Sequence, residues 1–102
     1  MNPRHLYRLA SLLVVATTNS IASPQLALEK KCLNCHQIDK KLIGPAYKQV
    51  AVKYRKDKDA ENRLVKKVLE GSYGTWGTVP MPANQVSDEE ARLLVKWVLS
   101  LK

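Results

Sequence analysis

The chain has 102 residues and a formal net charge of +8, with 17 Lys and Arg against 9 Asp and Glu. This length accommodates one domain and excludes a multidomain protein. A basic balance suggests an acidic partner or a nucleic acid, but the absence of a recognition motif and the export signal described next argue against nucleic-acid binding.

The first 22 residues have the organisation of a secretory signal peptide. Arg4 and Arg8 precede the apolar run Leu9–Ala16, and a polar stretch ends at Ala22. The alternative is a membrane anchor, but a spanning helix needs roughly 20 mainly apolar residues, and this run has eight. We predict cleavage after Ala22, export to the periplasm without stable membrane insertion, and one mature domain over residues 23–102.

The mature chain of 80 residues contains little aromatic bulk for a core. It has no Phe, and its aromatic residues are Tyr47, Tyr54, Tyr73, Trp76 and Trp97. A single apolar core in a chain of about this length seldom provides enough stability unaided. We therefore expect a large apolar group that is not part of the polypeptide to complete the interior.

Residues 24–31 are predicted to form a short helix that leads into the motif CLNCH, residues 32–36. Such a motif can bind zinc, exchange disulfides or attach haem. Zinc normally takes four ligands, whereas Cys32, Cys35 and His36 supply three. A thioredoxin-like pair requires a preceding strand in a βαβ unit, which this sequence does not predict.

Haem attachment uses all three residues of this motif. The two thiols add to the two vinyl groups of the porphyrin, and the adjacent His36 becomes an axial iron ligand. C-x-x-C-H is the signature of c-type haem attachment. With the export signal, the motif favours one covalent haem, joined at Cys32 and Cys35, over zinc or thiol exchange.

Two helices are predicted after the motif. The first spans Tyr47–Tyr54, and the second spans Ala60–Glu70, with Asp59 as its N-cap and Gly71 as a stop at positive φ. Their inward-facing residues are expected to be Val50, Ala51, Leu64, Val65, Val68 and Leu69.

The next segment, residues 71–86, has three glycines, two prolines and the one methionine outside the signal peptide, Met81. A long loop in so small a domain calls for a functional explanation. Pro80 and Pro82 restrict the backbone on both sides of Met81, so its thioether can be presented to iron. We predict Met81 as the second axial ligand.

The last helix is predicted from a capping box formed by Ser87 and Glu90, followed by an apolar stripe. The stripe contains Leu94, Trp97, Val98 and Leu101.

The segments CLNCH, IGPAYKQVA, GTWGTVPMPANQVSDEEA and KWVLS resemble small class I bacterial cytochromes c of the c-551/c-552 type. This resemblance covers the chain from about Leu28 to Lys102. It implies an all-α cytochrome c fold, with about four short helices and loops wrapped around one covalently bound haem.

The resemblance also implies further pocket residues. The Pro45 carbonyl would hold the far ring nitrogen of His36, Trp76 would reach a haem propionate, and Asn84 would hydrogen-bond near the Met81 sulfur. Thr78 and Ala83 stand where the family often has proline, so the loop is expected to be less stiff.

The implied function is that of a periplasmic, monomeric one-electron carrier rather than an enzyme. After cleavage, 15 basic and 9 acidic residues leave a charge of +6, and we expect a lysine rim to steer acidic redox partners to the haem edge. The rim would comprise Lys30, Lys31, Lys40 and Lys41 around an apolar centre of Leu33, Leu42, Ile43 and Val79.

The resemblance implies a bc-type complex as electron donor, and a nitrite reductase, peroxidase or terminal oxidase as acceptor. A haem enzyme or a gas sensor is the alternative function. Either would need an open or displaceable sixth iron position, and no second mature histidine could serve as a distal base.

Overall fold

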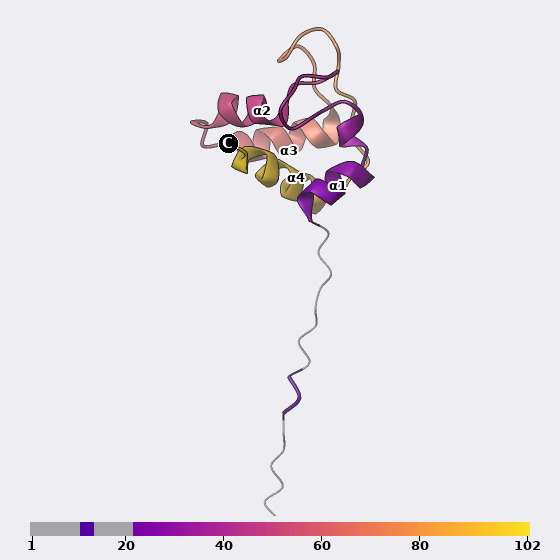
Figure 1. The fold of residues 1–102 in the computed structure, drawn as a ribbon, viewed down its shortest axis with the longest axis vertical. Coiled ribbons are helices and arrows are strands. Elements are labelled where there is room, and N and C mark those ends of the chain that lie inside the picture. Colours follow the sequence, from indigo (N-terminus) through magenta and orange to yellow (C-terminus); the bar gives the residue numbers. More distant parts are fainter. Residues whose placement is uncertain (1–10, 14–21) are drawn as a thin grey trace, which may run out of the picture.

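The computed structural model describes residues 11–13 and 22–102, so most of the predicted signal peptide lies outside the described residues. Its elements are α1 (Ser23–Glu29), the 3-10 helix η1 (Cys32–Asn34), α2 (Tyr47–Tyr54), α3 (Ala60–Glu70) and α4 (Asp88–Ser100) (Figure 1). In these ranges β-pairing is confined to a single bridge, between Ser72 and Met81. The prediction of an all-α fold is confirmed.

Helix α4 organises the domain because it contacts each of the other three α-helices (Figure 1). Its predicted capping box is confirmed: the Glu90 N–H donates to Ser87 Oγ at 3.0 Å, and the Ser87 N–H donates to Glu90 Oε1 at 2.9 Å. This backbone hydrogen bond from Ser87 lowers the pKa of Glu90. No helix in the described ranges combines the length and the apolar character needed to cross a bilayer.

Two groups of buried side chains meet along α4. The larger joins α2, α3 and α4 and contains Tyr47, Val50, Leu64, Val65, Ala91, Val95 and Val98. The smaller joins α1 to α4 through Leu26, Ala27 and Leu94. Val68, Leu69, Trp97 and Leu101, which were predicted to face inward, are only partly buried against the larger group.

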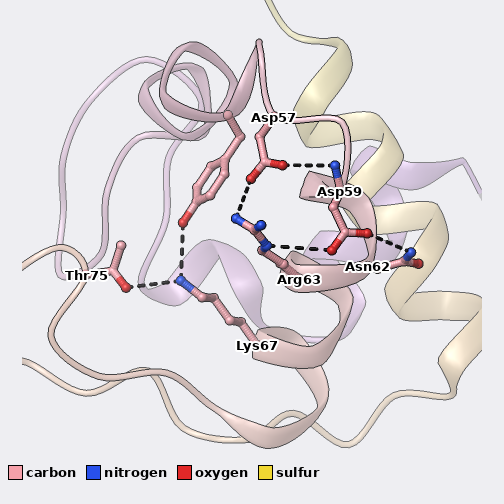
Figure 2. Close-up of polar contacts among 7 residues, drawn as sticks. Asp57, Asp59, Asn62, Arg63, Lys67 and Thr75 are labelled. Atoms are coloured by element: carbon pink, nitrogen blue, oxygen red, sulfur yellow. Dashed lines mark hydrogen bonds and ion pairs between the residues drawn. The ribbon is translucent and has the colours of Figure 1, made fainter.

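The start of α3 differs from the predicted cap. Asp59 occupies the N-cap position, but its side chain makes no capping hydrogen bond. Its carboxylate instead accepts from Asn62 Nδ2 at 3.2 Å and lies 3.6 Å from Arg63 Nε (Figure 2). Arg63 also pairs with Asp57 at 2.8 Å. The predicted N-cap position is therefore correct, but the Asp59 carboxylate is engaged by Asn62 and Arg63 instead of a backbone N–H.

Helix α1 ends at Glu29, two residues before the predicted end. Lys31 adopts a left-handed conformation with φ 63°, which redirects the chain into η1. This early turn brings the CLNCH motif back across α4, because Cys32 and Leu33 pack against both groups of core residues.

Candidate cofactor-binding site

A cavity of about 360 Å³ lies between the helices and two connecting segments. This volume lies within the roughly 300–1,000 Å³ typical of small-molecule and cofactor pockets. Five of the seven predicted site residues line it: Cys35, His36, Pro45, Trp76 and Met81. The helices contribute Val50, Leu64, Val68, Val95 and Val98, so the floor of the cavity is apolar.

One side of the cavity, here the imidazole wall, is formed by residues 32–47. The amides of Cys35 and His36 both donate to the Cys32 carbonyl, at 3.1 and 3.0 Å, so η1 turns the motif tightly. The Gly44 amide then donates to the Cys35 carbonyl at 2.7 Å. These bonds draw the two ends of the segment together around His36.

His36 is buried, with 9% of its surface exposed. Its Nδ1 lies 2.8 Å from the carbonyl oxygen of Pro45, as the resemblance implied. Because a carbonyl can only accept, Nδ1 carries a proton, and in the neutral imidazole the lone pair is then on Nε2. This is the tautomer in which imidazole binds a metal through Nε2, with its other ring nitrogen held by an outer partner.

The two cysteines differ in position. Cys35 lines the cavity, whereas Cys32 does not line it and packs against the core. Burial raises the pKa of the Cys32 thiol. Within the described ranges no three His, Cys, Asp or Glu side chains converge as a metal site.

A second segment, residues 71–84 and here called the methionine wall, contributes residues 72–82 to the cavity lining. Met81 and Ser72 exchange two backbone hydrogen bonds, of 2.8 and 2.9 Å. The bridge places Met81 beside the end of α3 and leaves residues 73–80 as an exposed loop. Gly71 has positive φ as predicted, 90°, but its ψ of 170° extends the chain directly into the bridge.

Two residues implied by the resemblance belong to the methionine wall. Trp76 lines the cavity but is 41% exposed, and Lys53 Nζ lies 5.5 Å from its ring centroid. Asn84 does not line the cavity. Its Nδ2 donates to the carbonyls of Val68 at 3.0 Å and Pro82 at 3.2 Å, so its amide ties the loop to α3.

Sequence reasoning missed Lys67, which lines the cavity from α3. Its Nζ donates to Tyr54 Oη at 3.2 Å and to Thr75 Oγ1 at 3.1 Å (Figure 2). Among the described residues it has no carboxylate partner, so it can meet an anionic cofactor group. The available signal was its spacing, because Leu64, Lys67 and Val68 share one helix face.

Two further residues missed from the sequence contact His36 directly. The Tyr47 ring stacks on the imidazole with centroids 4.9 Å apart and an interplanar angle of 21°. A Cβ on Gly44 would lie 2.5 Å from His36 Cε1, so this position needs glycine for space. Burial raises the pKa of Tyr47, and the neighbouring Cys32 thiol adds to the rise.

The residues present fit a covalently attached haem. The cavity lining is mostly apolar, and it includes both an imidazole whose Nδ1 is bonded to Pro45 and the methionine Met81. A thiol lies at the edge of the cavity and a second three residues before it in sequence. The basic Lys67 and the indole of Trp76 provide donors for carboxylates.

Comparison with known proteins supports this fit. The cytochrome c family model matches residues 22–102. Cytochrome c-551 of Pseudomonas aeruginosa is 46% identical over 101 residues, which cover 94% of this chain and 97% of that protein. Cytochrome c-552 of Hydrogenobacter thermophilus is 47% identical over 83 residues, covering 81% of this chain and 85% of that protein.

Solved structures show the same similarity. Wild-type Nitrosomonas europaea cytochrome c552 superposes with a TM-score of 0.75 and 45% identity, covering 78% of this chain and 99% of that chain. The chain therefore belongs to the cytochrome c family, and it is a small electron-transfer protein with covalently attached haem c rather than an enzyme.

Proposed function

We propose that this cytochrome is a periplasmic one-electron carrier whose iron is ligated by His36 Nε2 and Met81 Sδ. One observation carries the proposal: a buried imidazole with its Nδ1 bonded to Pro45 and a methionine anchored by a backbone bridge line the same apolar cavity. The signal-peptide pattern of residues 1–22 supports the location, and cleavage would leave residues 23–102 as the mature domain.

The haem would supply an iron that alternates between the ferrous and ferric states. The residues around it keep the coordination the same in both states, because Pro45 and the Ser72–Met81 bridge hold the two ligands. A methionine ligand raises the reduction potential of haem iron. Occupation of the sixth position by Met81 would also exclude oxygen and peroxide, which would separate a carrier from a haem enzyme or gas sensor.

The other pocket residues would fix the position of the cofactor. Cys32 and Cys35 would carry the thioether bonds. Trp76 would donate its indole N–H to a propionate, and Lys67 would add a positive charge beside it. Asn84 would act on Met81 by tethering the loop to α3 through the Val68 carbonyl, in addition to the predicted contact with the sulfur.

Partner docking would use the exposed residues around the cavity mouth. Ile43 and Val79 line the cavity and are more than half exposed, and Leu42 is nearly so. Lys31, Lys40 and Lys41 are exposed, whereas Lys30 pairs with Glu90 at 3.4 Å and Leu33 packs against the core. The effective rim would therefore consist of three lysines around three apolar residues.

Mass spectrometry and visible spectroscopy of protein from a periplasmic fraction test the assignment. We expect the mass of residues 23–102 plus one haem, and the spectrum of low-spin iron. Reduced protein should resist carbon monoxide at neutral pH, because Met81 occupies the sixth position. A mass without haem would overturn the cofactor assignment, and rapid complete binding of carbon monoxide would overturn the ligation by Met81.

The docking surface is tested by the kinetics of electron transfer to an acidic redox protein. Lys41→Gln should slow association and weaken its salt dependence, because rim charges act mainly on the association rate. Lys58→Gln is the matched control, because this exposed lysine does not line the cavity. Equal effects of the two substitutions would show that only net charge matters.

Partners such as a bc-type complex and a nitrite reductase, peroxidase or terminal oxidase would dock to a monomer through this surface.

A further inference from the structure

The hydrogen bond between His36 and Pro45 leaves one property of the imidazole undetermined. A bond from Nδ1 to a single acceptor, 2.8 Å long, fixes where that nitrogen points. It constrains rotation of the ring plane about the bond only weakly, because the angular preference at a carbonyl oxygen is broad. The ring plane must therefore be fixed by contacts to the face of the imidazole.

Tyr47 provides such a contact. Its ring lies nearly parallel to the imidazole, at 21° and 4.9 Å between centroids, and it is 7% exposed. Offset stacking of this kind contributes about 0.5–1.5 kcal/mol beyond the burial of area. The two rings are close enough for this contact to oppose rotation of the imidazole.

Tyr47 is itself held from several directions. Its amide donates to the Gln37 carbonyl at 2.9 Å, and the ring of Trp97 meets it edge-on at 5.5 Å and 76°. Its side chain also neighbours Cys32. A side chain fixed by α2, α4 and the CLNCH motif cannot follow the imidazole if that ring turns.

Gly44 limits the remaining space around the imidazole. A Cβ at this position would lie 2.5 Å from Cε1, 2.9 Å from Nδ1 and 3.1 Å from Nε2 of His36. The backbone thus approaches the ring around Cε1, while Tyr47 covers a face. Rotation of the imidazole would encounter one of the two.

We propose that Tyr47 is a positioning residue that sets the ring plane of the axial His36 through stacking of the two rings, and that Gly44 provides the space in which this plane is held. This inference rests on the ligation of iron by His36 proposed above. It assigns the role to the ring of Tyr47 and not to its hydroxyl group. The orientation of an axial imidazole plane determines its π overlap with the iron d orbitals, which spectroscopy reports.

The test compares Tyr47→Leu with Tyr47→Phe in the ferric holoprotein. Tyr47→Leu removes the stacking ring and should change the electron paramagnetic resonance g-values and the spread of the four haem-methyl NMR shifts. Tyr47→Phe keeps the ring and should preserve both. Leu94→Ala is the control for lost stability, because Leu94 packs in the smaller core group with α1 and does not line the cavity.

Spectra of Tyr47→Leu that match the wild type would overturn the proposal, as would equal changes in Leu94→Ala. Loss of the wild-type spectrum in Tyr47→Phe would assign the role to the hydroxyl and also overturn it. If Tyr47→Leu does not accumulate, nuclear Overhauser contacts between the two rings in reduced wild-type protein decide the matter, and their absence contradicts the stacking. Each of these results leaves the haem and its proposed carrier function intact, whereas a native protein without haem would remove both.

Discussion

The two walls of the cavity hold their proposed ligands in different ways. On the imidazole wall, His36 is buried, bonded to Pro45, stacked on Tyr47 and crowded by Gly44. On the methionine wall, Met81 is partly exposed and depends on a two-bond bridge to Ser72 at the base of an exposed loop.

The difference indicates that the two walls are coupled to the stability of the protein to different degrees. The imidazole wall is continuous with the core through Tyr47 and Val50, so its geometry is coupled to global stability. The methionine wall is attached through backbone contacts at its base, from Gly71, Ser72 and Asn84. We expect the methionine wall to open locally before the protein unfolds, because regions with few buried contacts have low local stability.

The largest effect on the free energy of unfolding is expected from Gly71→Ala, which places a side chain at the base of the methionine wall. The alanine would have to adopt the positive φ of Gly71, and its Cβ would lie 2.8 Å from the Met81 carbonyl oxygen. A residue other than glycine at φ 90° and ψ 170° costs about 1–3 kcal/mol and overpacking about 1–3 kcal/mol, so we expect a loss of about 2–6 kcal/mol. Guanidinium unfolding measures this loss, and the charge-transfer band of the Met–ferric bond should weaken in parallel.

Gly74→Ala is the matched control for this prediction. Gly74 has φ 87°, but a Cβ there would meet nothing within 4 Å. It should therefore show only the conformational cost of about 1–2 kcal/mol. Equal losses in the two variants would mean that contact with Met81 contributes nothing.

Gly44→Ala is the corresponding change on the imidazole wall. Its Cβ would lie 2.5 Å from His36 Cε1, and we expect overpacking to cost about 1–3 kcal/mol. The g-values of the ferric protein should change while the Met–iron band remains. Loss of the Met–iron band without a change in g-values would contradict the separation of the two walls.

A smaller change outside both walls should affect stability alone. Ser87→Ala removes the side chain that accepts the Glu90 N–H, and loss of an N-cap costs about 1 kcal/mol. Because α4 lines the cavity through Val95 and Val98, a shift of the helix would alter both spectroscopic signals. We expect neither signal to change, and an altered spectrum would show that the cap also positions the site.

The smallest effect on global stability is expected for Lys67→Gln, which loosens the contact between α3 and the exposed loop. Its hydrogen bonds to Tyr54 and Thr75 should contribute about 0.5 kcal/mol, at the low end for such bonds. Hydrogen exchange of residues 73–80 should nevertheless accelerate. Lys66→Gln is the control, because Lys66 is exposed and its one ion pair among the described residues, with Glu70 on the same helix, is long at 4.0 Å. Similar exchange rates in both variants would exclude a tether.

Local patterns were sufficient to predict the α-helices and the cofactor class. The capping box at Ser87 and Glu90, the stop at Gly71 and the apolar stripes depend on spacing within one element, so they were visible in the sequence. Cys32, Cys35 and His36 were predicted as haem-attachment residues for the same reason, because haem attachment uses neighbouring residues. Asp59 occupies the predicted N-cap position, but its carboxylate contacts Asn62 and Arg63 instead of a backbone N–H.

The sequence by itself determined the elements, the cofactor class and the candidate ligands, because these depend on short-range spacing and residue chemistry. Only the tertiary structure decided which side chains surround those ligands. Tyr47 meets His36, Ser72 pairs with Met81 and Lys67 reaches Thr75 only after α2, α3 and α4 have packed. Contacts of this kind depend on chain reversals such as the left-handed Lys31, and no periodicity in the sequence encodes them.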